Sequence, residues 1–154
     1  MGPLLFLLFI NDMPSVVDPH TEVRLFADDC LIYRTIRSVQ DQIQFQLDLS
    51  ALHNWGQVWG MKFNAKKCHI LTITNKEQPL IKFYELDGTV LQQVDCAMYL
   101  GILIHKTLRF SEHIRNTATK CSRRLGFFRR KLTNSPQNLK KTAYLSLVRS
   151  SAEY

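Results

Sequence analysis

The chain has 154 residues, of which 45% are hydrophobic and 10% aromatic, and its formal net charge is +7. This length suits one domain or one domain with an appendage, and this composition excludes an intrinsically disordered chain. The charge is uneven, because 10 of the 20 Lys and Arg residues lie in residues 111–154, beside only Glu112 and Glu153 as acids. A basic end of this kind predicts a polyanionic partner, although a solvated helical face carries the same charges.

The first predicted element is a helix over residues 2–12, in which Pro3 to Ile10 form an uninterrupted apolar run. No Lys or Arg precedes the run and it is too short to span a bilayer, which argues against a signal peptide or a membrane helix. We therefore expect a buried helix. Because the chain enters its core at once and stops at Tyr154 without a helix terminator, we expect a fragment. Without N-terminal partners, residues Leu4 to Ile10 are expected to leave apolar surface open, which promotes association.

Two β-favouring runs follow, over residues 23–27 and 30–34, and we expect them to form a hairpin with Asp28 and Asp29 at its tip. Adjacent carboxylates repel one another in a turn, and a divalent cation relieves that repulsion because hard cations prefer carboxylate oxygens. Two such cations are the usual apparatus for in-line attack on a phosphate. The pair predicts a metal-dependent nucleotidyl transfer site, with an ordinary solvated turn as the alternative.

Residues 38–60 predict a long helix that begins with a capping box at Ser38 and ends at Gly60. Its apolar residues recur at helical spacing, and we expect them to face the core: Ile43, Phe45, Leu47, Leu49, Ala51, Leu52, Trp55, Val58 and Trp59. Further strands are predicted over residues 69–74, 81–84 and 99–104, with Asp87-Gly88 as a turn. Gly101 interrupts the last of them, where a partner backbone approaches closely.

After Arg109 the pattern is helical, with Ser111 as the expected N-cap. Apolar residues recur at intervals of three and four along this first basic helix: Ile114, Ala118, Cys121, Leu125, Phe128 and Leu132. Ser135 and Pro136 open a second helix, in which one face is shared by Leu139, Ala143, Leu147 and Ser151. The basic residues beside the first stripe are candidates for phosphate contacts: Lys120, Arg123, Arg124 and Arg130.

The four cysteines are widely spaced and form no Cys-x-x-Cys pair: Cys30, Cys68, Cys96 and Cys121. This spacing predicts reduced thiols in a nuclear or cytoplasmic protein rather than a disulfide framework. Together with the five histidines it matches no common zinc pattern.

Four blocks of the sequence, taken in order, resemble the reverse transcriptase of non-LTR (LINE-like) retrotransposons. Residues 2–14 are similar to the family's segment QGSVLGPLLF…INDLP, and Phe26-Ala27-Asp28-Asp29 is similar to its FADD box. Residues 59–68 resemble its W-G-L-x-x-N-x-x-K-[TC] segment, and Tyr99-Leu100-Gly101-Ile102 resembles its YLG box. The likeness covers residues 2–104, and the basic helices beyond it are similar to the thumb of this family.

The resemblance implies an α+β fold. Residues 1–108 form part of a right-hand polymerase palm, an antiparallel sheet with packed helices, and residues 109–154 form the start of a helical thumb. The implied activity is RNA-directed DNA polymerisation by two-metal nucleotidyl transfer, with Mg²⁺ or Mn²⁺ as cofactor. The implied partners are an RNA template and a DNA primer, with deoxynucleotides as substrates of the complete enzyme, and no membrane.

The resemblance also implies roles for single residues. Asp28 binds metal and Asp29 supports the metal site more loosely. Lys67, or alternatively Lys66, protonates or neutralises the leaving pyrophosphate, and Gly101 lies in the primer grip. The family's further metal-binding Asp and its fingers are absent from these residues, so we expect no polymerisation by the chain alone. Two alternatives are a remnant that binds nucleic acid in a salt-dependent way, and a decayed reading frame without a role.

Overall fold

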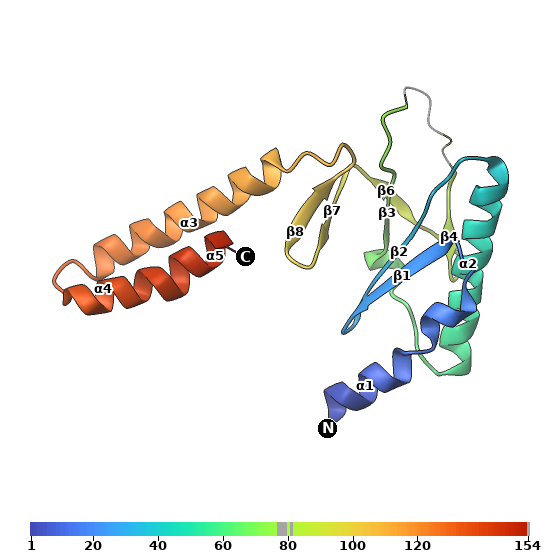
Figure 1. Ribbon diagram of the computed structural model, residues 1–154, viewed down its shortest axis with the longest axis horizontal. Helices are drawn as coiled ribbons and strands as arrows, with labels where there is room; N and C mark the ends of the chain where they lie inside the picture. The colour runs from blue at the N-terminus through green and yellow to red at the C-terminus, as the bar shows by residue number, and fades with distance from the viewer. Residues whose placement is uncertain (77–79, 81, 154) are drawn as a thin grey trace.

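The computed structural model describes residues 1–76, 80 and 82–153. Residues 2–105 carry all the described strands and form what we call the body, and residues 111–153 form a helical hairpin that extends away from it (Figure 1). Helices and small sheets are both present, in agreement with the predicted α+β class. None of the helices in the described part of the chain has the length and apolar character needed to cross a membrane.

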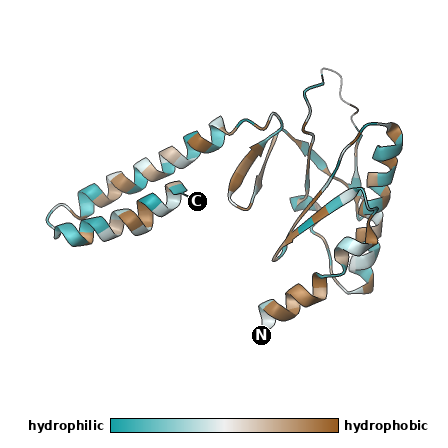
Figure 2. Ribbon diagram, viewed as in Figure 1, coloured by the Kyte–Doolittle hydropathy of each residue, from teal (hydrophilic) through white to brown (hydrophobic). Residues whose placement is uncertain are grey.

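Helix α1 (Gly2–Ile10) and the short 3-10 helix η1 (Met13–Val16) open the body. One side of α1 packs near Trp55 through Phe6, Phe9 and the buried Ile10. The prediction of a buried helix was wrong, whereas the expected open apolar surface is confirmed, because four leucines are between 49% and 74% exposed: Leu4, Leu5, Leu7 and Leu8. Figure 2 shows that α1 is hydrophobic along its length. A helix that meets a neighbour on one side buries one face only, however apolar its other faces are.

Strands β1 (Thr21–Phe26) and β2 (Asp29–Arg34) form the predicted antiparallel hairpin. Phe26 pairs with Asp29, so the two turn residues are Ala27 and Asp28 rather than the two aspartates. Ala27 has a φ of 51°, as the first residue of a tight two-residue hairpin turn requires. Asp28 therefore lies in the turn, and Asp29 begins β2.

Helix α2 (Val39–Val58) begins with the predicted capping box at Ser38, and Gly60 follows its end with a φ of 68°. The buried face differs from the prediction. Buried apolar residues are Phe45, Leu49, Leu52 and Trp55. Four of the residues predicted to face the core are instead 41% to 80% exposed: Ile43, Leu47, Val58 and Trp59. Because apolar residues occur on several sides of α2, their spacing did not determine which side meets the strands.

The remaining elements of the body are short: η2 (Ala65–Lys67), β3 (His69–Leu71), β4 (Glu85–Leu86), β5 (Thr89–Val90), β6 (Gln92–Val94), β7 (Cys96–Tyr99) and β8 (Ile102–His105). Among the described residues the strands form four two-stranded sheets, of which β3–β6 is parallel and β1–β2, β4–β5 and β7–β8 are antiparallel. The antiparallel pairing that the resemblance implied is present in three of these sheets, and β3–β6 differs from it. The long connection from β3 to β6, which contains the β4–β5 hairpin, lets these two strands run in the same direction.

Three strand predictions need correction. The strand expected over residues 69–74 ends at Leu71. Of the strand expected over residues 81–84, Ile81 lies outside the described residues, and residues 82–84 are not in a strand. The strand expected over residues 99–104 is instead a hairpin whose tip is Leu100-Gly101, with φ angles of 46° and 83°. A two-residue turn with two positive φ angles favours glycine, and this requirement explains Gly101.

Two buried apolar clusters hold the body together. One contains Phe45, Leu49, Tyr84, Leu86 and Leu91, and the other contains Ile10, Met13, Leu52 and Trp55. Ile32 and Phe63 pack against both clusters. The core therefore joins α2, β2 and the β4–β5 hairpin, whose predicted turn at Asp87-Gly88 is confirmed.

The helical hairpin consists of α3 (Ser111–Lys131) followed by α4 (Gln137–Ala143), the π-helical segment η3 (Tyr144–Arg149) and α5 (Ser150–Glu153). Both predicted helices are confirmed, but their first residues differ. Phe110, not Ser111, is the N-cap of α3, and Pro136 is the N-cap of α4 rather than its first residue.

The two helices of the hairpin bury little. Among the described residues of the helical hairpin, one hydrophobic residue is buried, Val148, which is 5% exposed. Of the predicted stripe on α3, Cys121, Phe128 and Leu132 are half-buried, whereas Ile114, Ala118 and Leu125 are exposed. On the second helix Ala143 and Ser151 are half-buried, whereas Leu139 and Leu147 are exposed. Each helix therefore buries about half of its predicted face.

Candidate functional site

The carboxylates of Asp28 and Asp29 lie at the free tip of the β1–β2 hairpin. Both residues are exposed, and neither side chain has a hydrogen bond or an ion pair with the residues that the structure describes. Their oxygens are therefore available to a ligand. The tip is defined by the strand register, since Phe26 and Asp29 form the last pair of the ladder.

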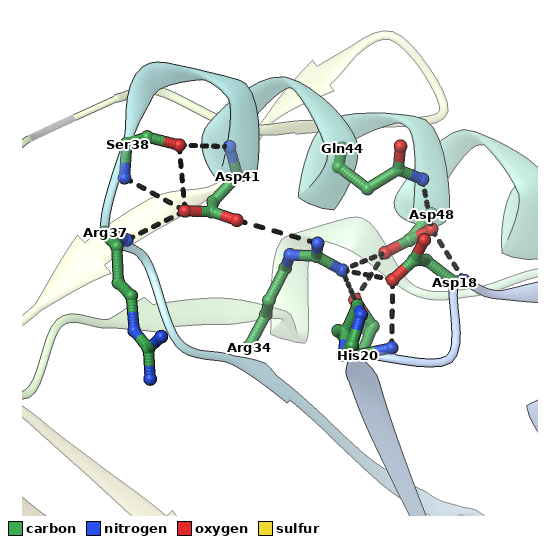
Figure 3. A network of polar contacts seen from close by, with 9 residues as sticks. Asp18, His20, Arg34, Arg37, Ser38, Asp41, Gln44 and Asp48 are labelled. Atoms are coloured by element: carbon green, nitrogen blue, oxygen red, sulfur yellow. Dashed lines mark hydrogen bonds and ion pairs between the residues drawn. The ribbon is translucent and has the colours of Figure 1, made fainter.

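The opposite end of this hairpin is held to α2 by a polar network around Arg34 (Figure 3). The Arg34 side chain is 8% exposed, and its Nη1 lies 2.7 Å from Asp18 Oδ1 and 3.9 Å from Asp48 Oδ2. Nη2 lies 3.6 Å from Asp41 Oδ1, and Nη1 also donates to Thr21 Oγ1 at 2.9 Å. Thr21 and Arg34 are partners in the strand register, so the network acts on the base of the hairpin.

Asp48 is the buried acid of the network, at 2% exposure. Its Oδ1 accepts hydrogen bonds from the Asp18 backbone N–H at 3.0 Å and from Gln44 Nε2 at 3.1 Å. Its Oδ2 accepts from the Thr21 hydroxyl at 2.5 Å. A buried carboxylate is stable only with a nearby cation and with its lone pairs satisfied. These contacts fasten β1, β2 and α2 to one another.

The network lowers the pKa of two of its carboxyls, those of Asp18 and Asp41. The Arg34 guanidinium hydrogen-bonds to Asp18 and, with the His20 backbone N–H, holds the pKa of that carboxyl below its usual value. The Arg37 backbone N–H and the Ser38 hydroxyl likewise lower the pKa of Asp41. Sequence reasoning missed this network. An acid such as Asp48 inside an otherwise apolar helical face was the available signal.

The structure brings the segment carrying Lys67 close to the hairpin. Lys66 and Lys67 are exposed on η2, and neither forms an ion pair with a described residue. Cys68 follows Lys67, and Cys30 follows Asp29. Burial raises the pKa of the Cys30 thiol to about 11, and the nearby Cys68 thiol adds to the rise. The residues that follow Asp29 and Lys67 are therefore neighbours in space, and all four cysteines are free, as predicted.

The donor chemistry of the tip suits a hard cation. Two carboxylates supply the oxygen ligands that Mg²⁺ and Mn²⁺ prefer. The number of donors is small, because the described residues contain no group of three or more His, Cys, Asp or Glu that could hold a metal ion. The residues fit the implied cation in kind, and a complete two-metal site needs further ligands.

The other candidate residues belong to other elements. Gly101 is at the turn of the β7–β8 hairpin. On α3, Lys120, Arg123 and Arg130 are exposed, whereas Arg124 is half-buried. Arg124 Nη1 donates to the Leu147 carbonyl at 3.0 Å and also to the Ser151 hydroxyl. Arg124 therefore joins the two helices of the hairpin, and the other three basic side chains remain available for phosphate contacts.

Residues 1–104 match a protein family described as reverse transcriptase (RNA-dependent DNA polymerase). The chain is 31% identical over 124 residues to the RNA-directed DNA polymerase from mobile element jockey of Drosophila melanogaster, a match to 75% of this chain and 13% of that protein. It is 32% identical over 133 residues to the probable RNA-directed DNA polymerase from transposon BS of the same species, covering 81% of this chain and 15% of that protein.

A third relative is the Retrovirus-related Pol polyprotein from type-1 retrotransposable element R1 of Nasonia vitripennis, at 24% identity over 150 residues, 93% of this chain and 44% of that protein. The chain thus spans 13% to 15% of the length of the two Drosophila relatives. No solved structure gave a significant match. The matches confirm the resemblance that the four ordered sequence blocks predicted.

Proposed function

Because the chain belongs to the reverse transcriptase family of non-LTR, LINE-like retrotransposons, we propose that it forms part of an RNA-directed DNA polymerase. In this proposal residues 1–108 are part of the palm and residues 109–154 are the start of the thumb. The observation that supports it best is the β1–β2 hairpin, whose two tip carboxylates are exposed and unpaired while its base is fastened to α2.

Asp28 and Asp29 hold Mg²⁺ or Mn²⁺ in the complete enzyme. The bound cations supply stabilisation of the charge that develops on the attacking and leaving oxygens of a phosphate. The Arg34 network serves this site by keeping the hairpin in place, since charge stabilisation depends on groups positioned before the reaction. Lys67, with Lys66 as the alternative, donates a proton to the leaving pyrophosphate or neutralises it. Gly101 brings the backbone of the β7–β8 turn close to the DNA primer.

The 154-residue chain is not expected to polymerise by itself. Two carboxylates do not complete a two-metal site, and the described residues offer no third ligand beside them. The RNA template, the DNA primer and the deoxynucleotides are therefore assigned to a longer enzyme of which this chain supplies a part.

Primer extension on an RNA template with Mg²⁺ tests the proposal. A chimera in which residues 1–104 replace the matching segment of the jockey polymerase is expected to extend the primer, and the chain alone is not. Asp28→Asn in the chimera is expected to abolish extension. Asp87→Asn is the matched control, because Asp87 is also an exposed aspartate in a two-residue hairpin turn. Extension by the chain alone would show that the two carboxylates suffice.

Thermal melting with and without Mn²⁺ tests the metal ligands separately. Mn²⁺ is expected to raise the melting temperature of the wild-type chain and not that of Asp28→Asn. Without metal, the substitution is expected to be neutral or slightly stabilising, because it removes the repulsion between neighbouring carboxylates. If Mn²⁺ does not change the melting temperature of the wild-type chain, metal binding by this chain is contradicted.

A second candidate function is nucleic-acid binding by the helical hairpin, which the excess of 10 basic over two acidic residues in residues 111–154 favours. Lys120, Arg123 and Arg130 are each expected to contact one phosphate. A plot of the logarithm of the association constant for a single strand against the logarithm of the salt concentration then has a slope of about −2. Binding that does not change with salt contradicts this function.

A further inference from the structure

A pocket of about 350 Å³ lies between the two helices of the hairpin, lined by Arg123, Arg124, Phe127, Phe128 and Leu147. Its lining is mostly apolar, although the surrounding surface is strongly basic. Phe127 is 49% exposed and Leu147 is 47% exposed, so the pocket opens to solvent. The rings of Phe127 and Phe128 lie edge to face, with centroids 5.6 Å apart and an interplanar angle of 76°. The pocket therefore presents an aromatic ring that the protein itself does not cover.

The wall opposite α3 has an unusual backbone. Leu147 belongs to the π-helical segment η3, and its carbonyl accepts hydrogen bonds from Arg124 Nη1 at 3.0 Å and from Ser151 Oγ at 3.2 Å. The widened π-helical turn is held against α3 by Arg124 and by the buried Val148. π-helical turns are rare and occur frequently at functional sites.

Positive charge surrounds the exposed aromatic ring. Lys120, Arg123 and Arg130 are spaced by three or four residues from Phe127 or from one another, so they lie on the same face of α3. None of these three side chains is neutralised by an acid among the described residues. A ligand that combines an aromatic group with negative charges on either side of it complements both the pocket and this charge.

We propose that the pocket binds one unstacked base of a single-stranded nucleic acid, an inference that rests on the proposed nucleic-acid binding of the helical hairpin. Phe127 stacks on the base, and Arg123 and its basic neighbours contact the phosphates on either side. Stacking tolerates every base, so little sequence preference is expected. Bases in a duplex are paired and stacked, and the hairpin therefore binds a single strand more tightly than a duplex of the same sequence.

Fluorescence anisotropy with the 154-residue chain and three labelled probes tests this inference. The probes are a single-stranded RNA, a fully abasic strand of the same length and charge, and a blunt duplex. Phe127→Ala is expected to weaken binding to the single-stranded RNA by about fivefold to about a hundredfold and to leave binding to the abasic strand unchanged. Phe127→Tyr is expected to retain binding, because a tyrosine ring also stacks.

Leu139→Ala is the matched control, because Leu139 is exposed on the same hairpin and lies outside the pocket lining. It is expected to bind all three probes as the wild type does, and circular dichroism checks that all three variants keep their helices. If the wild type binds the abasic strand and the duplex as tightly as the RNA, the pocket inference fails and nucleic-acid binding stands. If Phe127→Ala binds the RNA normally, the pocket serves another ligand, such as an aromatic side chain of a protein. If the wild type binds no probe, both proposals fail.

Discussion

The body and the helical hairpin hold their shapes in different ways. Nine of the ten buried hydrophobic residues among those described lie in the body, and Val148 is the tenth. The buried polar residues Thr21, Gln42 and Asp48 also lie in the body. The body therefore depends on contacts between segments far apart in sequence. The helical hairpin depends on the hydrogen bonds within its helices and on a contact between them that contains Val148 and half-buried side chains. Since both tryptophans lie in the body, tryptophan fluorescence reports that region selectively.

The largest expected effect is that of Arg34→Ala on the body. The substitution leaves Asp48 buried without a cation, and breaking a buried pair in this way costs about 3–5 kcal/mol of unfolding free energy. Denaturant unfolding followed by tryptophan fluorescence measures the loss. Arg24→Ala is the control, because the Arg24–Glu22 pair is exposed and its removal is expected to change little. Equal effects of the two substitutions would contradict the role given to the network.

Leu52→Ala is expected to destabilise the body next most strongly. Leu52 is 1% exposed, and truncation of a buried leucine costs about 2–5 kcal/mol through lost burial and a remaining cavity. Leu47→Ala on the same helix is the control, because Leu47 is 55% exposed and its truncation is expected to change stability by less than about 0.5 kcal/mol. A larger loss of unfolding free energy for Leu47→Ala than for Leu52→Ala would indicate that the side of α2 predicted from the spacing is the buried one.

Val148→Ala tests the hairpin in the same way. Removal of two buried methyl groups lowers the free energy of unfolding by about 1–2 kcal/mol. This loss is smaller than those expected in the body, but Val148 is the buried hydrophobic residue between the two helices among those described. Hydrogen exchange measured by mass spectrometry is expected to increase across residues 111–153 and to stay unchanged in α2. Leu145→Ala, at a 39% exposed position in the same π-helical segment, serves as the control. Faster exchange in α2 would show that the two regions are coupled.

The smallest expected effect is a difference in acid stability. The pKa values of Asp18 and Asp41 are lowered in the folded state from an unfolded value of about 3.9. Their stabilisation is therefore complete above about pH 3.9 and is lost as the pH falls through the folded-state pKa values. Denaturant unfolding followed by tryptophan fluorescence is expected to show a less stable body below about pH 4, while residues 111–153 keep their protection from hydrogen exchange. Asp41→Asn should weaken this pH dependence of the body, and equal losses in both regions argue against it.

Features that depend on neighbours in the chain could be predicted. The capping box at Ser38 and the turn at Asp87-Gly88 rest on hydrogen bonds and φ angles within a few residues, and both are confirmed. The turn at Leu100-Gly101 was mistaken for a strand, because the apolar run continues through it. Local composition does not reveal where a continuous apolar run reverses direction.

The candidate site shows the same difference between features set by nearby residues, which could be predicted, and contacts between distant residues, which could not. The hairpin and the turn position of Asp28 followed from the β-favouring runs on either side, although Asp29 begins β2 instead of lying in the turn. The partners of Arg34 could not be predicted, because Thr21, Asp18 and Asp48 lie 13, 16 and 14 residues from it along the chain. They belong to β1, to the loop before β1 and to α2, respectively. No periodicity relates such residues. The role of Arg124 in joining two helices was missed for the same reason, since Leu147 is 23 residues away.

The sequence by itself determined the family, the long helices and the β1–β2 hairpin that presents Asp28 and Asp29, because these depend on local residue patterns and on ordered motifs. Only the tertiary structure decided which side of α2 is buried, which acids hold Arg34, and which part of the basic helices forms a pocket. The physical reason is that burial and ion pairing depend on which distant segments meet, and a helix with several apolar sides is compatible with more than one such meeting.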